Sequence, residues 1–239
     1  MNNDIDLIKK YLPKDKWDEA IQKLESGYPV QYIIGNVEFF NTIINVNEDV
    51  LIPRFETEYL VQDIINLLKE QEILQPDIID IGTGSGAIAI ALKKNYPCFV
   101  SAIDISEKAI KLAKENAKLN HTNILFMEKD VNDFDSNIKY DVIVSNPPYV
   151  LDGDYVDEKT KYEPQNAIFV PNEDGLYFYR IILEKSINLL KKPGIIAFEI
   201  GNAQKDSLKR LAKEYYPNAK IIQKNDLNNL PRYFYIINE

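Results

Sequence analysis

Strand-like and helix-length segments alternate from residue 77 to the end of the chain, and this alternation restricts the fold more than any other feature of the sequence. Short apolar runs predict strands at 77–82, 98–104, 122–127, 140–145, 194–200, 219–224 and 232–237. Helical patterns predict helices at 85–95, 106–119, 173–191 and 202–215. Strands separated by helices form a mostly parallel sheet that is covered on both faces. The expected fold is therefore α/β, with a doubly wound, seven-stranded sheet.

The end of this sheet should differ from the rest. The last two predicted strands are joined by the short segment Asn225 to Pro231, which cannot hold a crossover helix. Strands joined so closely are antiparallel neighbours. We therefore expect the last strand to run in the reverse direction.

The residues before this alternating region follow other patterns. Apolar residues spaced by three and four predict two short amphipathic helices before Gly27, through Ile5, Ile8, Leu12, Trp17, Ile21 and Leu24. Helices this short are unstable alone, so we expect them to dock on the main body. Residues 37–52 are typical of a β-hairpin or an extended linker, and a further helix follows through Leu60, Ile64, Leu67 and Leu68. The expected parts are a helical region at 1–35, a hairpin linker at 36–54 and a main domain at 55–239.

Charge and composition exclude several classes of function. The 239 residues include 28 basic and 37 acidic side chains, a net charge of −9 that disfavours attachment to nucleic-acid backbones. One cysteine excludes an intrachain disulfide and a cysteine-clustered zinc site, and with one histidine as well, no metal site is expected. The amino terminus has no signal-peptide pattern, and no apolar run approaches the ~18 residues that span a bilayer. We expect a cytoplasmic protein with no membrane partner.

A glycine-rich turn, Gly82-Thr83-Gly84-Ser85-Gly86, lies between the first predicted strand of the sheet and an apolar helix. Glycine allows positive φ and lets a ligand approach the backbone, and the helix N-terminus behind it supplies free N–H groups. Asp104 ends the next strand, where a carboxylate can accept both hydroxyls of a ribose. The turn therefore predicts a nucleoside-containing cofactor. Taken alone, it is also compatible with a nicotinamide cofactor.

A second rigid turn, Asn146-Pro147-Pro148-Tyr149, follows the strand at 140–145. The prolines remove two backbone donors, and the Asn146 side chain offers one acceptor and two donors. Such a corner can hold a planar NH2 group of an amide or an amino-purine, although it can also be a plain turn. The corner and the glycine turn should meet at the carboxyl ends of parallel strands. A dehydrogenase needs no such corner, whereas a methyl donor bound in the glycine turn would present its sulfonium methyl group there.

The combined motifs resemble a known family. The glycine turn, Asp104 and the proline corner are similar to those of class I S-adenosylmethionine-dependent methyltransferases that act on nitrogen. Further motifs resemble the peptide chain release factor N5-glutamine methyltransferases (the PrmC/HemK family): Gly27-Tyr28-Pro29-Val30-Gln31-Tyr32, Pro53-Arg54-Phe55-Glu56-Thr57-Glu58, Tyr162-Glu163-Pro164, Asp174-Gly175-Leu176 and Glu199-Ile200-Gly201. Phe55 stands where the family more often has proline.

The resemblance implies a set of site residues. S-adenosylmethionine would be held by Gly82, Thr83, Gly84, Ser85, Gly86, Asp104, Val131 and Asn146, with Asp104 at the ribose and Val131 against the adenine. The substrate glutamine would be held by Asn146, Pro147, Pro148 and Tyr149, with Asn146 and Pro147 as the catalytic pair. The partner would be a peptide chain release factor, recognised by residues 1–35, and the enzyme would act as a monomer.

Other functions and roles remain open from the sequence. The alternatives are a glutamine methyltransferase of a ribosomal protein, an adenine-N6 nucleic-acid methyltransferase and a non-catalytic cofactor-binding protein. Arg54 and Glu56 form an ion pair or contact the active site. Glu163 and Glu199 are expected to be structural.

Overall fold

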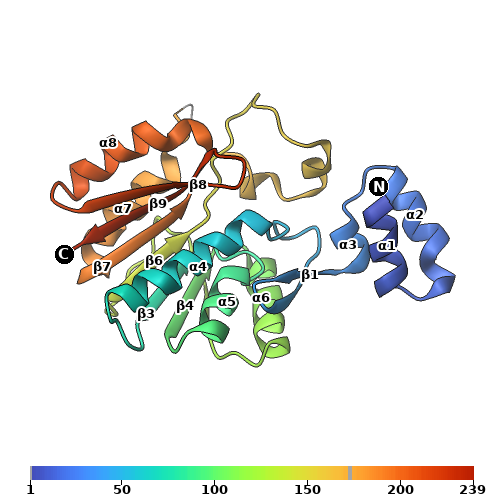
Figure 1. Ribbon diagram of the computed structural model, residues 1–239, viewed down its shortest axis with the longest axis horizontal. Coiled ribbons are helices and arrows are strands. Elements are labelled where there is room, and N and C mark those ends of the chain that lie inside the picture. The colour runs from blue at the N-terminus through green and yellow to red at the C-terminus, as the bar shows by residue number, and fades with distance from the viewer. Residues whose placement is uncertain (1, 172–173) are drawn as a thin grey trace.

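In the residues that the structure describes, 2–171 and 174–239, seven strands form one sheet in the order β5-β4-β3-β6-β7-β9-β8 (Figure 1). The structure is a computed structural model. Its strands in this sheet are β3 (Asp77–Ile81), β4 (Phe99–Asp104), β5 (Leu125–Glu128), β6 (Tyr140–Ser145), β7 (Leu190–Glu199), β8 (Lys220–Asn225) and β9 (Pro231–Asn238). Strand β9 runs antiparallel to β7 and β8, and the other pairs are parallel. The predicted doubly wound, mostly parallel sheet and its reversed last strand are confirmed.

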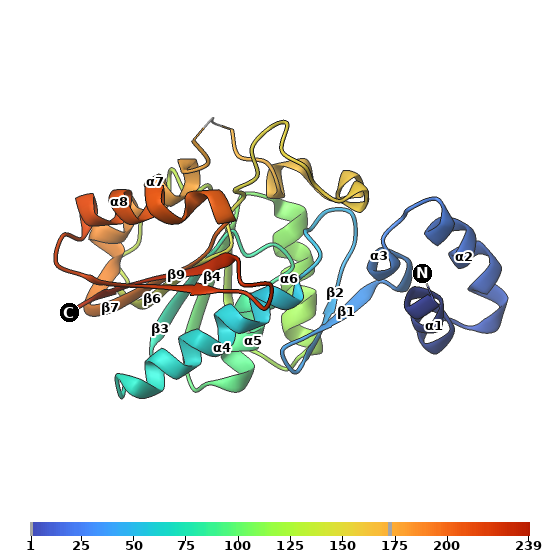
Figure 2. The same ribbon diagram turned by 45° about the horizontal axis from the view of Figure 1, so that its top comes forward.

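Helices cover both faces of this sheet (Figure 2). One face carries α4 (Phe55–Glu70), α5 (Ala87–Asn95) and α6 (Glu107–Leu119), and the other carries α7 (Tyr177–Leu189) and α8 (Lys205–Tyr215). Successive side chains of a strand point to opposite faces. Ile78 accordingly joins the core under α4–α6, whereas Ile79 joins the core under α7 and α8. Both faces are buried, which explains why the strand sequences are almost continuously apolar.

Several predicted boundaries differ from the structure. The strand predicted at 194–200 begins at Leu190. The strand predicted at 122–127 begins at Leu125, because α6 is followed by a turn in which His121 has a φ of 56°. The helix predicted at 173–191 begins at Tyr177 and ends at Leu189, and residue 173 lies outside the described residues. The segment predicted as a helix at 202–215 contains a 3-10 turn, η4 (Asn202–Gln204), before α8. The long β6–α7 connection holds two further 3-10 turns, η2 (Glu158–Tyr162) and η3 (Gln165–Ala167).

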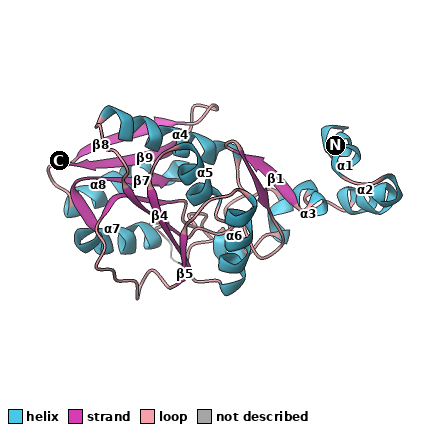
Figure 3. Ribbon diagram, turned by 90° about the horizontal axis from the view of Figure 1, so that it is seen from below, coloured by secondary structure: helices cyan, strands magenta, loops and turns pink. Residues whose placement is uncertain are grey.

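The N-terminal helices form a separate group at one end of the molecule (Figure 3). They are α1 (Asn2–Tyr11), α2 (Trp17–Glu25) and α3 (Val30–Ile34), with the 3-10 turn η1 (Lys14–Lys16) between the first two. Ile8, Ala20, Leu24 and Val30 form a small core of their own. The apolar faces of the two predicted helices pack on each other and on a third, unpredicted helix rather than on the main body. The group does contact the main body, as expected, but through polar side chains: the Tyr162 hydroxyl donates to the Ser26 carbonyl at 3.1 Å, and Lys159 pairs with Asp4 at 3.8 Å. The predicted division into 1–35, 36–54 and 55–239 stays a prediction.

A β-hairpin joins this helical group to the main body, as the linker pattern predicted. Its strands are β1 (Asn36–Phe39) and β2 (Thr42–Asn45). Asn116 of α6 exchanges two hydrogen bonds with the Asn45 backbone, of 2.8 and 3.0 Å, and Asn120 donates to the carbonyl of Ile43 at 2.7 Å. Side-chain amides of α6 thus satisfy the outer edge of β2. In the part of the chain described here, no helix has the length and apolar character needed to cross a membrane.

Candidate active site

The glycine turn and the proline corner lie side by side at the carboxyl ends of β3 and β6. These strands are parallel neighbours with Asp80 opposite Val144, so Gly82 and Asn146 occupy the next equivalent positions beyond them. The Ser145 hydroxyl donates to the Ile81 carbonyl at 2.7 Å and ties the two strand ends together. The strand order reverses here, which is where ligands bind in open α/β sheets.

The three glycines of the turn have different roles, although all have positive φ. The φ values of Gly82, Gly84 and Gly86 are 73°, 54° and 85°. A Cβ atom added at Gly86 would lie 3.1 Å from the side chains of Ile90 and Ala113, so this glycine lets α5 pack closely on α6. A Cβ added at Gly82 or Gly84 would meet no atom within 4 Å. The turn therefore leaves open space beside the backbone at these two positions.

The Asp104 carboxylate closes the turn from the neighbouring strand. It accepts hydrogen bonds from the backbone N–H groups of Gly84 at 2.8 Å and Ser106 at 2.9 Å, through different oxygens. Burial raises the pKa of Asp104, and these backbone hydrogen bonds oppose the rise. A carboxylate has about four acceptor positions, so Asp104 can still accept from a ligand hydroxyl. Val131 lies in the loop after β5, half-buried against the core under α7 and α8.

Asp80 is a further titratable group beneath the turn that the site prediction did not include. Its side chain is fully buried and accepts a hydrogen bond of 2.6 Å from the Thr83 hydroxyl. Burial raises the pKa of Asp80 to about 7, although the hydrogen bonds from Thr83 and the Ala89 backbone oppose the rise. An acid within the apolar run 78–81 was the signal that could have identified it.

The proline corner borders a cavity of about 180 Å³. Asn146, Pro147, Pro148 and Tyr149 all line it, together with Arg54 and Glu199. The structure thus brings the four predicted substrate-binding residues together on one surface. The loop that carries η2 and η3 supplies much of the remaining wall, through Val156, Asp157, Thr160, Ala167 and Ile168.

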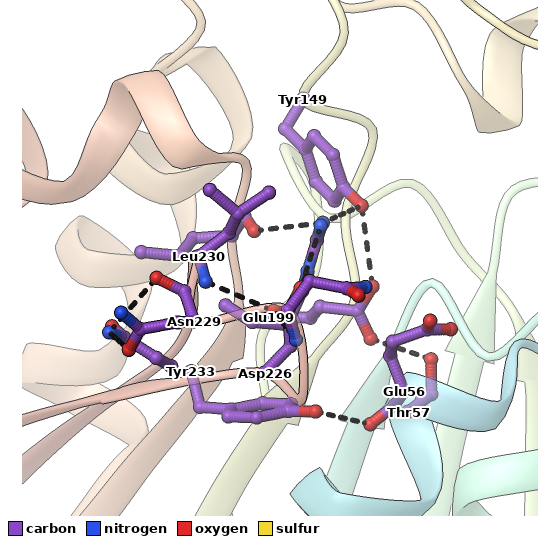
Figure 4. Close-up of polar contacts among 12 residues, drawn as sticks. Glu56, Thr57, Tyr149, Glu199, Asp226, Asn229, Leu230 and Tyr233 are labelled. Carbon is purple, nitrogen blue, oxygen red and sulfur yellow. Dashed lines mark hydrogen bonds and ion pairs between the residues drawn. The ribbon is translucent and has the colours of Figure 1, made fainter.

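The buried carboxylate of Glu199 is hydrogen-bonded to residues that form or support the proline corner. It lies at the end of β7, is 2% exposed, and accepts hydrogen bonds from Thr57 at 2.6 Å and Tyr149 at 3.3 Å through its two oxygens (Figure 4). The Thr57 oxygen in turn accepts a hydrogen bond of 3.4 Å from the Asn146 side-chain nitrogen. Burial raises the pKa of Glu199, and the neighbouring Thr57 and Arg232 oppose the rise. Glu199, expected to be structural, therefore forms part of the cavity wall.

Tyr149 is held at both its ring and its backbone. Its hydroxyl accepts a hydrogen bond of 3.1 Å from Arg232, whose guanidinium pairs with Asp226 at 3.3 Å. Its carbonyl accepts a hydrogen bond of 3.0 Å from Gln204. A Cβ at Gly201 would lie 2.4 Å from the Gln204 side-chain oxygen, so glycine is needed there for this contact. The Glu199-Ile200-Gly201 motif thus supports Tyr149 in two ways: Glu199 accepts from its hydroxyl, and Gly201 leaves room for Gln204 to bond its carbonyl.

The sequence left open whether Arg54 forms an ion pair with Glu56 or contacts the active site. Arg54 does form an ion pair and does line the cavity, but its partner is another glutamate. It pairs with Glu163 at 2.5 Å rather than with Glu56, and it lines the cavity. The second Glu163 oxygen accepts from the Ile52 backbone at 2.9 Å. Glu56 contributes its backbone carbonyl, which accepts a hydrogen bond of 2.8 Å from Tyr233.

Known proteins with similar sequences include several release factor glutamine methyltransferases. The family model of the methyltransferase small domain matches residues 57–162. A release factor glutamine methyltransferase of Flavobacterium psychrophilum is 42% identical over 213 residues, which are 86% of this chain and 75% of that protein. The Bacillus anthracis protein of the same name is 39% identical over 223 residues, or 90% of this chain and 78% of its own.

Solved structures agree on the fold. A T. thermophilus 16S rRNA N2 G1207 methyltransferase, solved in complex with AdoMet and guanosine, superposes with a TM-score of 0.64 at 12% identity. The match covers 85% of this chain and 50% of that one, and it shows a shared Rossmann-like methyltransferase fold. The sequence relatives are much closer and decide the family. The chain belongs to the release factor glutamine methyltransferase family.

Proposed function

We propose that this protein transfers a methyl group from S-adenosylmethionine to the side-chain nitrogen of glutamine in the Gly-Gly-Gln loop of peptide chain release factors. The observation that carries the proposal is the juxtaposition of the glycine turn with the proline corner at adjacent strand ends, in a chain of this family. The proposal implies a cytoplasmic enzyme that acts as a monomer.

The residues of the turn fit the proposed cofactor. Gly82, Thr83, Gly84, Ser85 and Gly86 would hold its methionine portion, and the open space beside Gly82 and Gly84 supports this assignment. Asp104 would accept the ribose hydroxyls through its remaining acceptor positions, Val131 would contact the adenine, and Asn146 would border the methyl group. When bound, the cofactor supplies an electrophilic methyl group on a sulfonium centre.

The corner would prepare the glutamine amide as a nucleophile. The lone pair of an amide nitrogen is delocalised into its carbonyl, so the nitrogen must be held at contact distance with the lone pair aimed at the methyl carbon. Asn146 Oδ1 and the Pro147 carbonyl would accept its two N–H groups and stabilise positive charge developing on nitrogen. Pro148 and Tyr149 would form the walls. Orientation of this kind lowers barriers by up to ~7–11 kcal/mol in well-aligned intramolecular reactions.

The proton that the methylated amide must lose needs no dedicated base. An N-methylated amide cation is strongly acidic and releases its proton readily once formed. The catalytic requirement is therefore geometric: two acceptors on the NH2 group and a fixed line of approach to the methyl carbon. One acceptor would be the backbone carbonyl of Pro147, and the other would be the side-chain oxygen of Asn146, which its neighbours hold in place.

The test uses the purified protein, S-adenosylmethionine with a labelled methyl group and a purified release factor. Mass mapping should find one methyl group on the glutamine of the Gly-Gly-Gln loop. A release factor with that glutamine replaced by alanine is the matched control and should stay unlabelled. Label in DNA or in a ribosomal protein alone, with none in the release factor, would contradict the proposal.

A further inference from the structure

Glu199 fixes which groups donate and which accept in the hydrogen bonds behind the proline corner. An ionised carboxylate only accepts hydrogen bonds. Thr57 carries one hydroxyl hydrogen, and its oxygen lies 2.6 Å from Glu199 Oε2, so that hydrogen is donated to the carboxylate. The Thr57 oxygen can then only accept a hydrogen bond from its other neighbour.

The other neighbour of Thr57 is the Asn146 side chain. Asn146 Nδ2 lies 3.4 Å from Thr57 Oγ1 and donates to it. The nitrogen and the oxygen of a side-chain amide branch in different directions from one carbon, so with Nδ2 held by Thr57 the oxygen remains as the acceptor of this side chain. Asn146 also lines the cavity, where this oxygen can accept a hydrogen bond from a ligand.

We propose that Thr57 and Glu199 are positioning residues that fix the amide orientation of Asn146, keeping its oxygen toward the substrate and its nitrogen toward Thr57. The proposal deepens the function proposed above and rests on it. With the opposite orientation, Asn146 would present N–H donors to the N–H groups of the substrate amide. The corner would then repel the group that it has to hold.

The surroundings favour this role over simple packing. Thr57 lies in the first turn of α4, Glu199 ends β7 and Asn146 follows β6, so three separate elements converge on one amide. The second Glu199 oxygen accepts from the Tyr149 hydroxyl, which also accepts from Arg232. Burying a carboxylate that is 2% exposed costs free energy that a neutral side chain would not. The hydrogen bonds from Asn146 to Thr57 and from Thr57 to Glu199 both run toward Glu199, so the group at that end has to be one that only accepts.

The inference also defines the chemical class of substrate at the corner. A site whose side-chain acceptor cannot rotate into a donor recognises a group with hydrogens to donate. A primary amide fits this requirement, because its nitrogen carries hydrogens that the Asn146 oxygen can accept, whereas a tertiary amide or an ester has none to donate to that oxygen. The fixed orientation of the Asn146 amide therefore favours a substrate with an NH2 group, whatever the rest of that substrate is.

The first test compares Thr57→Val, Thr57→Ser and Thr42→Val. Thr57→Val removes the acceptor for Asn146 Nδ2, and we expect kcat to fall about tenfold, the value of one hydrogen bond, with unchanged affinity for the methyl donor. Thr57→Ser retains the hydroxyl and should keep most of kcat. Thr42 is an equally buried threonine in the hairpin whose hydroxyl donates to the Phe39 carbonyl, so Thr42→Val is a matched control that should keep kcat.

The second test asks whether Glu199 acts through Thr57. In Glu199→Gln the new amide can accept from only one of Thr57 and Tyr149, so kcat should fall. The same change made in Thr57→Val should then cause little further loss, because the relay is already broken. Full kcat in folded Thr57→Val, or equal losses of Glu199→Gln in both backgrounds, would overturn the inference.

Neutron diffraction separates failure of this inference from failure of the proposed function. In the native protein one deuteron of Asn146 Nδ2 should point at Thr57 Oγ1, and in Thr57→Val the amide should be found in both orientations. An Asn146 oxygen next to Thr57, with the deuterated nitrogen in its place, would overturn the inference, whatever the substrate. If no release factor is methylated while the deuterons lie at Thr57, the proposed function fails and the orientation holds.

Discussion

Replacing single glycines of the turn by alanine should separate cofactor binding from folding. Every such alanine has to adopt a positive φ, which costs roughly 1–2 kcal/mol of folding stability. The three informative positions differ in what the added methyl group meets. At Gly84 it meets open space, at Gly86 it meets Ile90 and Ala113 at 3.1 Å, and at Gly27, in the N-terminal helical group, it meets nothing within 4 Å.

The expected results follow from these surroundings. Gly27→Ala and Gly84→Ala should lose about the same free energy of unfolding, ~1–2 kcal/mol, because both carry backbone strain alone. Gly86→Ala should lose more, since overpacking adds ~1–3 kcal/mol. Only Gly84→Ala fills the space assigned to the cofactor, so its dissociation constant for S-adenosylmethionine should rise at least tenfold, or about 1.4 kcal/mol.

Urea unfolding gives the three stabilities, and calorimetric titration of the folded variants gives the affinities. Gly27→Ala is the matched control for strain and should bind the cofactor like the native protein. If Gly84→Ala also binds it with native affinity, the open space beside the turn does not hold the cofactor. The assignment of Gly82 to Gly86 would then be refuted.

Three further predictions concern the acids and the corner. Asn146→Ala should lower kcat about 100-fold, because it removes an oriented group that stabilises the transition state, while titration finds unchanged cofactor affinity; native turnover would contradict its role. Asp80 has a pKa of about 7 in the folded protein, above ~3.9 when unfolded, so its contribution to stability is complete below about pH 4 and is lost as the pH rises through 7. Asp80→Asn should therefore gain stability relative to the native protein between pH 5 and pH 8 in urea unfolding, and a constant difference would contradict this. Arg54→Ala leaves Glu163 buried without its ion-pair partner and should lower the free energy of unfolding by roughly 3 kcal/mol; adding Glu163→Gln should recover part of the loss, and no recovery would show that the buried charge is not the cause.

The parts of the fold that rest on local patterns could be predicted from the sequence. The apolar strand runs, the glycine turn and the Asn-Pro-Pro-Tyr corner each lie within a few consecutive residues, and parallel topology brings the two loops to one edge. The reversed last strand followed from the short Asn225–Pro231 connection. The start of β5 at Leu125 could not be predicted, because it depends on the turn at His121, and the spacing of apolar residues carries no information about that turn.

The support of the corner could not be predicted in the same way. Thr57 and Glu199 are 142 residues apart in the chain, and the hydrogen bond between them exists only because α4 and β7 meet in the fold. The ion-pair partner of Arg54 could not be predicted for the same reason, because Glu163 lies 109 residues away in the sequence. Buried acids within apolar strands were the available signal, at Asp80 and at Glu199. Local periodicity gave the N-terminal helices but not the surface against which they pack.

The clamp between the hairpin and α6 has a consequence for substrate size. Asn116 and Asn120 fasten β2 to a helix of the main body, and Tyr11 of α1 donates to Glu38 of β1 at 2.7 Å. The span from the helical group to the cavity is thereby set by folded structure rather than by a loose tether. A protein that touches α1–α3 while its glutamine enters the cavity must therefore match that span.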